Sequence, residues 1–298
     1  THNRAAFLPR AVESARRAGT DLEIIVVDNA STDDTPQVCE KLKGVRYVRL
    51  GRNARAAGAR NVGIRESRSA YIALLDDDDL RLPDSLDVQL SLLQSTPQAA
   101  LVYGQALIGD AQDCLPTGDY YPDPCPTGDV FWQLLENNFI PVLSVVARKE
   151  RLIEAGLFDE SLTSTQDWDM WLRVTEKCEV IAVEEPVAIY RKWTLSSGQT
   201  SSDRALVYGN AALVQARGLA LPRAMAASPR RREQVRRQFL NRMSDGLMYE
   251  AGAALAGKHL RAACADVGAA LRLRPSRIAH PRALRSFFAG ALRQVVRS

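Results

Sequence analysis

Apolar and polar residues alternate along the first hundred positions with two different periods. Runs of consecutive apolar, often β-branched residues are typical of buried strands, and an apolar residue at every third or fourth position is typical of amphipathic helices. Strand-like runs cover residues 22–27, 45–50, 70–75 and 99–103, and helix-like stretches cover 5–18, 35–42, 56–67 and 86–94. Strands that alternate with helices in this way predict βαβ units and a largely parallel sheet.

The pattern changes after residue 103. Residues 104–128 hold few apolar positions and four prolines, which is typical of a long binding loop or lid. Further on, the pattern predicts helices over 130–135, 149–155 and 168–177, and strands over 143–147, 180–183 and 187–190. Residues 194–202 are polar and predict a mobile linker, beyond which Ala, Leu and Arg recur at helical spacing. We therefore expect an α/β domain over 1–200 and a basic helical region over 201–298.

The composition excludes several classes of protein. Of the 298 residues, 46% are hydrophobic and 25% are charged, unlike a disordered or fibrous chain. The apolar runs are far shorter than the roughly 18–20 residues that a membrane-spanning helix needs. Five scattered cysteines without a C-x-x-C pair argue against a disulfide framework and a zinc ribbon, and they favour a reducing compartment.

The charge is divided unevenly along the chain. Residues 204–298 hold 18 basic and four acidic residues, a net charge of +14, whereas residues 1–203 carry −10. A basic region of this kind favours phosphate groups on lipid or nucleic acid. Residues 283–296 predict a basic amphipathic helix typical of anionic membrane surfaces, although its apolar side could instead pack on the preceding helices. That side consists of Leu284, Phe287, Phe288, Ala291, Leu292 and Val295, and the other side carries Arg282, Arg285, Arg293 and Arg297.

The most informative feature is the run Asp76–Asp79, which directly follows the predicted strand 70–75. Ligands of open α/β sheets bind at the carboxyl ends of strands, and adjacent carboxylates repel one another unless a cation neutralises them. Because alternate residues of an extended segment point the same way, Asp76 and Asp78 can share one partner. Such oxygen ligands suit Mg²⁺ or Mn²⁺, which in turn suit a diphosphate. The alternative is a solvated acidic turn in which Asp79 caps the next helix.

Two other polar segments lie beside predicted elements. Asp28 and Asn29 end the strand 22–27, and Asn29 could either recognise a base or occupy a turn. Asp167 precedes a predicted helix, where it could cap that helix or act as a general base, and Trp168 could provide an aromatic wall for a sugar ring. Arg55, Arg60 and Asn61 could hold phosphate oxygens, although such arginines are more often solvated.

The chain lacks the motifs of several other enzyme classes. It contains no G-x-x-x-x-G-K-[ST], no G-x-G-x-x-G after a strand, no G-x-S-x-G and no H-E-x-x-H. A phosphoryl-transfer site would need D-x-D-x-[TV], whereas Asp79 is followed by Leu80 and Arg81.

Taken together, the polar segments make the chain resemble the family 2 glycosyltransferases, which have a GT-A fold. The resemblance covers about residues 1–193 and rests on motifs that come in the family's order and spacing. They are T-H-N-R at 1–4, E-I-I-V-V-D-N-A-S-T-D-D-T at 23–35, A-R-N-V-G-I at 59–64, Y-I-A-L-L-D-D-D-D-L at 71–80 and Q-D-W-D-M-W-L-R at 166–173. Since the family's first strand would precede Thr1, we expect that something upstream of Thr1 has been removed.

The resemblance implies a role for each of these positions. The donor nucleotide would be bound by Thr1, His2, Asp28, Asn29, Arg55, Asp76 and Asp77. Asp78 would be the direct ligand of Mg²⁺ or Mn²⁺ and Asp167 the catalytic base, with Trp168 and Asp169 on the acceptor side. Asn29 stands where an Asp is commoner, and Gln166 where a Glu is more usual.

The implied reaction transfers a sugar, with inversion, from a UDP- or dTDP-sugar to a glycan or polyprenyl-linked acceptor. We expect a cytoplasmic enzyme of cell-surface polysaccharide synthesis, peripheral on the inner membrane if the C-terminal helix binds anionic lipid. One alternative is a nucleotide-sugar-binding protein without catalysis. The other is a nucleic-acid-binding module carried by Arg230, Arg231, Arg232, Arg236 and Arg237, although the acidic body and the lack of interleaved aromatic residues lead us to expect no nucleic acid.

Overall fold

The computed structural model describes residues 1–192 and 204–297, so the predicted linker over 194–202 lies outside the described residues. The chain divides into two compact units. The first comprises Thr1–Leu134 and Asn138–Leu221, and the second Leu135–Asn137 and Pro222–Ser298.

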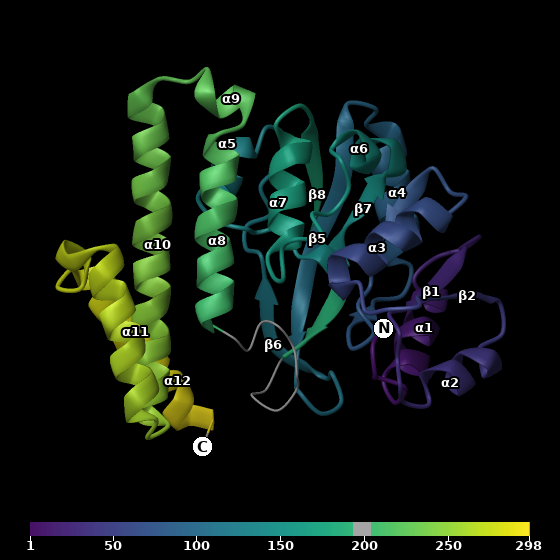
Figure 1. Ribbon diagram of the computed structural model, residues 1–298, viewed down its shortest axis with the longest axis horizontal. Coiled ribbons are helices and arrows are strands. Elements are labelled where there is room, and N and C mark those ends of the chain that lie inside the picture. The colour runs from purple at the N-terminus through teal and green to yellow at the C-terminus, as the bar shows by residue number, and fades with distance from the viewer. Residues whose placement is uncertain (193–203, 298) are drawn as a thin grey trace. The chain divides into compact units, whose positions relative to one another are not determined.

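The first unit begins with a small βαβ substructure (Figure 1). Its elements are α1 (Leu8–Arg17), β1 (Ile24–Asp28), α2 (Thr35–Lys41) and β2 (Val45–Arg49), all where the apolar pattern predicts them. Strands β1 and β2 pair in parallel, as a helical crossover requires. The apolar faces of both helices cover β1 in one core cluster, whose buried members are Leu8, Val12, Val26 and Cys39.

A six-stranded sheet forms the rest of the α/β core, with strand order β3-β7-β5-β8-β4 and β6 paired to β5. The strands are β3 (Tyr71–Ala73), β4 (Leu80–Arg81), β5 (Ala99–Gly109), β6 (Pro116–Tyr121), β7 (Val146–Arg148) and β8 (Glu179–Arg191). The α/β class is therefore confirmed. Strand β8 is one continuous strand that covers both of the short strands predicted over 180–183 and 187–190. Its pairing with β5 has a register shift near Pro186.

The prediction of a largely parallel sheet is wrong in detail, because the sheet is mixed. Strands β5 and β8 pair in parallel, but β7 pairs antiparallel with both β3 and β5. It follows that β3 and β5 run in the same direction, as their helical crossover predicts, and that β7 is inserted between them. The apolar pattern predicts the crossover but not the strand that enters the gap.

The prediction of a loop over 104–128 is also wrong for part of that segment. Strand β5 continues to Gly109 and pairs with β6, which begins at Pro116. The residues of β6 are all exposed, and an edge strand tolerates a proline because part of its backbone faces solvent. Fully buried apolar positions in β5 and an edge partner thus produce a strand pair where the prolines suggested a loop.

Helices complete the first unit on both sides of the sheet. They are α3 (Arg55–Glu66), α4 (Ser85–Ser95), α5 (Phe131–Leu134), α6 (Lys149–Glu154), α7 (Gln166–Thr175) and α8 (Arg204–Leu219). The predicted strand over 143–147 begins instead as a 3₁₀ turn, Val142–Ser144, before β7. Helix α7 begins two residues earlier than predicted, which places Asp167 inside its first turn rather than at its N-cap.

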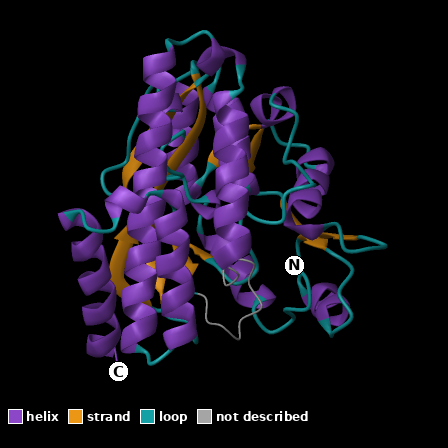
Figure 2. Cartoon of the chain, turned by 60° about the vertical axis from the view of Figure 1, so that its left-hand side comes forward, coloured by secondary structure: helices purple, strands orange, loops and turns teal. Residues whose placement is uncertain are grey.

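The described residues of the second unit form helices and no strand (Figure 2). They are α9 (Pro222–Met225), α10 (Pro229–Ala256), α11 (Leu260–Leu273) and α12 (Pro281–Arg297), with a 3₁₀ turn at Pro275–Arg277. Helices α10 and α12 approach closely at two glycines, since a Cβ on Gly252 would collide with the Phe287 carbonyl and one on Gly290 with the Tyr249 carbonyl. Within the described residues, no helix combines the length and the apolar character that crossing a bilayer requires.

Candidate active site

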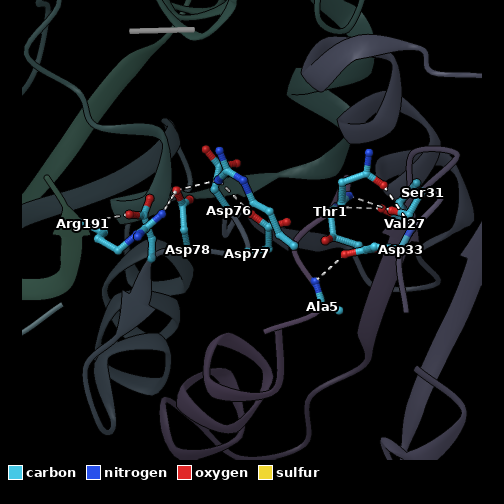
Figure 3. Close-up of polar contacts among 12 residues, drawn as sticks. Thr1, Ala5, Val27, Ser31, Asp33, Asp76, Asp77, Asp78 and Arg191 are labelled. Carbon is cyan, nitrogen blue, oxygen red and sulfur yellow. Dashed lines mark hydrogen bonds and ion pairs between the residues drawn. The ribbon is translucent and has the colours of Figure 1, made fainter. Parts of the chain in front are cut away.

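Asp76–Asp79 lie just after β3, where the chain leads into a turn, and Figure 3 shows Asp76, Asp77 and Asp78. Asp78 and Asp79 are almost completely buried, with exposed fractions of 4% and 2%. The side chain of Asp76 is the most accessible of these, at 44%. The run is therefore not the solvated turn that was considered as an alternative.

Three arginines from distant parts of the chain pair with these carboxylates. Arg60 on α3 donates to both oxygens of Asp76, at 2.7 and 3.0 Å. Arg4 contacts Asp77 at 3.2 Å and Asp78 at 2.5 Å. At the end of β8, Arg191 contacts Asp78 at 3.2 Å with its guanidinium and donates its backbone N–H to Asp79 at 2.8 Å.

The protonation of Asp76, Asp78 and Asp79 follows from burial and from these pairs. Burial would raise the pKa of Asp76, but the Arg60 guanidinium outweighs it, so the pKa is lowered. Burial raises the pKa of Asp78, although Arg4 opposes it. The pKa of Asp79 is raised well above its ordinary value by burial and then by the charges of Asp76 and Asp78. The Asp76 carboxylate is thus the most firmly ionised of these three.

The residues fit a hard divalent cation that is held partly by its substrate. Asp77 keeps one buried oxygen, Oδ2, without a hydrogen-bond partner, and Asp76 is accessible. Among residues 1–192 and 204–297, no three His, Cys, Asp or Glu side chains converge on one point. Mg²⁺ commonly takes one or two carboxylates together with substrate phosphates and water. The accessible carboxylate of Asp76 and the unpaired oxygen of Asp77 match that kind of site, whereas Asp78 is buried and paired with Arg4 and Arg191.

The end of β1 holds the first residue of the chain beside Asp28. The Thr1 amino group donates to the Val27 carbonyl at 2.9 Å, and the Asn29 N–H donates to the Thr1 carbonyl at 2.8 Å. Thr1 Oγ1 and His2 Nδ1 are buried without a hydrogen-bond partner. Figure 3 shows this segment beside the acidic run.

Asp28 and Asn29 are occupied by contacts within the protein. Fully buried Asp28 accepts from the Ser31 N–H at 2.8 Å and from the Tyr47 hydroxyl at 2.6 Å. Burial alone would raise the pKa of Asp28, but these hydrogen bonds lower it. Asn29 donates to the Asn53 side chain at 3.0 Å and accepts from the Ala54 N–H at 2.7 Å. Asn29 thus shapes the segment before α3, whereas Asp28 holds the turn after β1 and the Tyr47 side chain of β2.

Asp167 lies near the Arg60–Asp76 pair. Its carboxylate accepts from the Asn138 side-chain amide at 3.1 Å. Burial raises the pKa of Asp167, and the positive charge of Arg60 partly opposes this. A carboxylate whose pKa is raised toward neutrality is suited to accept a proton. Arg60 interacts with Asp76 and Asp167 together, so the structure brings the acidic run and Asp167 together.

Trp168 and Asp169 lie elsewhere on α7. Trp168 is 5% exposed, and its indole donates to the Leu134 carbonyl at 2.7 Å. Asp169 accepts two hydrogen bonds from Arg173, at 2.9 and 2.7 Å. Arg55, at the start of α3, is exposed and has a φ of +57°. The structure does not bring these three side chains into contact with the acidic run.

Comparison with known proteins agrees with this architecture. Residues 1–148 match the family model described as glycosyl transferase family 2. An uncharacterized glycosyltransferase of Rickettsia felis is 27% identical over 197 residues, which cover 64% of this chain and 31% of the relative. The chain belongs to the family 2 glycosyltransferases.

Other family 2 relatives carry more specific names. The succinoglycan biosynthesis protein ExoO of Rhizobium meliloti is 42% identical over 88 residues, covering 28% of this chain and 25% of the relative. Chondroitin synthase of Escherichia coli is 28% identical over 180 residues, covering 59% and 25%. The chain thus spans less than a third of the length of each of these three relatives.

The fold also matches that of a solved GT-A glycosyltransferase. The crystal structure of S. aureus TarS 1–349 in complex with UDP superimposes with a TM-score of 0.63 at 16% sequence identity. The match covers 100% of this chain and 90% of that chain. At this identity the likeness shows the fold alone.

Two residues that contact the acidic run were missed by sequence reasoning, and a third was underestimated. Arg4 and Arg191 were not singled out, and Arg60 was considered mainly as a phosphate ligand. The available signal was the acidic run itself, since a buried group of carboxylates needs positive partners. The arginines at strand and helix ends were the nearest candidates, but only the fold shows which of them reach the run.

Replacing Arg60 with Ala will destabilise the first unit, because it leaves Asp76 without its partner. Breaking a buried ion pair costs about 3–5 kcal/mol, and the accessibility of Asp76 reduces this to roughly 1–3 kcal/mol. Urea denaturation at pH 7 measures the loss. Arg65→Ala, on the exposed face of the same helix, is the matched control, and equal stability of the two variants would contradict the role given to Arg60.

Proposed function

We propose that the first unit transfers a sugar, with inversion, from a UDP- or dTDP-sugar to a hydroxyl group of a glycan or lipid-linked acceptor. Family membership supports glycosyl transfer. The names of two relatives, a succinoglycan biosynthesis protein and a chondroitin synthase, support polysaccharide synthesis. The titles of TarS structures with UDP and with UDP-GlcNAc support a uridine nucleotide as the first donor to test.

One observation carries the proposal most directly. Three buried side-chain atoms without a hydrogen-bond partner, Thr1 Oγ1, His2 Nδ1 and Asp77 Oδ2, belong to residues expected to bind the donor nucleotide. Buried polar atoms rarely remain unpaired in folded proteins. A nucleoside diphosphate supplies hydroxyl and amide groups as well as phosphate oxygens, and these would satisfy such atoms.

Asp28, Asn29 and Arg55 complete the proposed nucleotide site. The contacts of Asp28 and Asn29 support a role in shaping the pocket wall, and a second lone pair on the Asn29 oxygen can still accept from a pyrimidine N–H. Arg55 is exposed at the start of α3, so its side chain is free of the core and available to a bound nucleotide in this proposal.

The chemistry needs two separate sets of groups. Asp167 takes the proton from the acceptor hydroxyl while that oxygen attacks the anomeric carbon, and the nucleoside diphosphate departs on the other side. Arg60 keeps Asp76 ionised and lies near Asp167. It therefore helps to fix the position of the proposed base relative to the proposed donor site. Trp168 supports this part of α7 from the core, and we retain Asp169 as a proposed acceptor-side residue.

A divalent cation belongs to this proposal. Asp76 and Asp78 would hold Mg²⁺ or Mn²⁺, with Asp78 as the direct ligand. When bound, the cation neutralises charge on the diphosphate leaving group. Arg4 and Arg191 already pair with Asp78 in the protein itself, so a cation bound to Asp78 would share that carboxylate with the two arginines.

Asp167→Asn will reduce the turnover of sugar transfer by about 10²–10⁴-fold, the usual contribution of a general base. The affinity for UDP will change little, because Asn keeps the shape of the side chain and lies apart from the diphosphate. The wild-type kcat/KM will fall as pH decreases through the pKa of Asp167, since only the ionised form accepts a proton. That acid limb will lie above about pH 3.9, the ordinary value for Asp.

Steady-state release of UDP measures both effects. Asp129→Asn, an Asp-to-Asn change outside the proposed site, is the control for general effects of the substitution. Full turnover of Asp167→Asn, or an acid limb that persists in that variant, would reject Asp167 as the base. Donor binding without any turnover in the wild type would indicate a nucleotide-sugar-binding protein instead.

The second unit supports a membrane partner for this reaction. On α12, Leu284, Phe288 and Leu292 follow one another at intervals of four residues and are 41%, 61% and 65% exposed. The opposite side of the helix, with Ala283 and Gly290, packs against α10. The apolar positions of α12 are therefore only partly used for packing within the unit.

An anionic bilayer surface fits this exposed stripe. Residues 222–298 hold 16 basic and four acidic residues, and exposed Arg282 and Arg285 lie near the stripe. In peripheral helices, apolar side chains typically enter the membrane interface, and neighbouring arginines bind the lipid phosphates. We propose that α12 binds the anionic cytoplasmic face of the inner membrane and so brings the enzyme to a lipid-linked acceptor.

Phe288→Gln combined with Leu292→Gln will weaken binding to vesicles of phosphatidylglycerol and phosphatidylcholine by about tenfold or more, since each lost apolar contact contributes over 1 kcal/mol. Co-sedimentation measures the bound fraction, which will also fall as salt screens the arginines. Leu260→Gln, at a leucine of α11 that is 64% exposed, is the matched control. Equal binding of wild type and double variant, or wild-type binding to neutral vesicles alone, would contradict this proposal.

A further inference from the structure

The segment between α6 and α7 connects directly to Asp167. Residues 155–165 form no regular element, and Leu157 and Thr165 adopt left-handed backbone conformations, with φ of +63° and +58°. Non-glycine residues adopt this conformation at a cost, so other contacts must stabilise the path of the segment. Because Thr165 is the N-cap of α7, the path also sets where α7 begins.

Asn61 on α3 holds the first part of this segment. Its side-chain amide donates to the Phe158 carbonyl and accepts from the Phe158 N–H, both at 2.9 Å. The same amide donates to Glu160 at 2.9 Å, and Asn61 is 2% exposed. Its neighbour Arg60 lies over the Phe158 ring and pairs with Asp76. One turn of α3 therefore contacts both the acidic run and the segment that leads to Asp167.

Helix α8 holds the second part. The Asn210 side chain donates to the hydroxyl groups of Thr163 and Ser164, at 3.1 and 2.9 Å. Two turns further along the same face, Arg217 pairs with Asp159 at 2.6 Å. A pocket of about 490 Å³ lies beside this contact and is lined in part by Arg217, Asp159 and Asp169. Close packing is thus incomplete here, and the polar contacts carry much of the connection between α8 and the segment.

We propose that Asn61, Asn210 and Arg217 are positioning residues that hold the 155–165 segment from two sides and so fix Asp167 in its partly buried, active position. The inference rests on the proposed role of Asp167 as the base. None of the three residues touches the reacting groups: they act through the segment. Helix α8, which follows the α/β core in sequence, thereby becomes part of the catalytic unit.

The double variant Asn210→Ala, Arg217→Ala tests the inference. Amide hydrogen exchange in residues 159–170 will be faster than in wild type. The rate of UDP release from UDP-GlcNAc, with water as the acceptor, will fall by about tenfold, since small misplacements of a catalytic group are costly. The acid limb of the rate will move to lower pH, because water that reaches Asp167 removes part of the burial that raises its pKa. The affinity for UDP will stay within about twofold.

Controls separate positioning from general destabilisation. Arg217→Lys keeps the ion pair and will recover most of the rate, and Leu213→Ala, on an exposed part of α8, will behave like wild type. Unchanged hydrogen exchange in the double variant overturns the inference whether or not the enzyme turns over. A parallel loss of UDP affinity and rate, without movement of the acid limb, also overturns it. Absence of UDP release from wild type rejects the proposed function or donor instead. Hydrogen exchange then still shows whether Asn210 and Arg217 hold the 155–165 segment.

Discussion

The run of four consecutive carboxylates, two of them buried, is the constraint on which the rest of the first unit depends. Asp76–Asp79 follow β3, and water is largely excluded at Asp78 and Asp79, where unpaired ionised groups would be very costly. Three arginines offset this cost by pairing with the carboxylates: Arg4 before α1, Arg60 on α3 and Arg191 at the end of β8. Folding of the small βαβ substructure, the central helix and the long strand is thereby coupled to one acidic run.

The same interactions explain why the site is organised for chemistry. Arg60 lowers the pKa of Asp76 and opposes the rise in the pKa of Asp167, so one guanidinium adjusts two carboxylates with different proposed tasks. Asn61, the next residue, holds the segment that leads to Asp167. The A-R-N sequence at 59–61 therefore connects the acidic run with the segment that leads to Asp167 through two adjacent side chains.

The sequence predicts the order of helices and strands well, but it predicts less well which strands pair and which distant side chains meet. The β1–α2–β2 unit and α3 follow from local apolar periods, and the polar strand ends at Asp28 and Asp76 follow from the same pattern. The insertion of β7 between β3 and β5 depends on long-range pairing, and the extension of β5 was obscured by the prolines near β6. Arg191 lies 113 residues from Asp78, so no local pattern could assign it to the acidic run.

Calorimetric titration of UDP into the protein, with and without Mn²⁺, tests the central claim most directly. We expect UDP to bind the wild type more tightly when Mn²⁺ is present, and Asp78→Ala to lose this dependence. Asp113→Ala, which removes an aspartate that lies outside the acidic run, will retain it. Equal binding of UDP by wild type and Asp78→Ala, or no binding of UDP or dTDP under either condition, would contradict the assignment of Asp76–Asp79 to a nucleotide-sugar donor site.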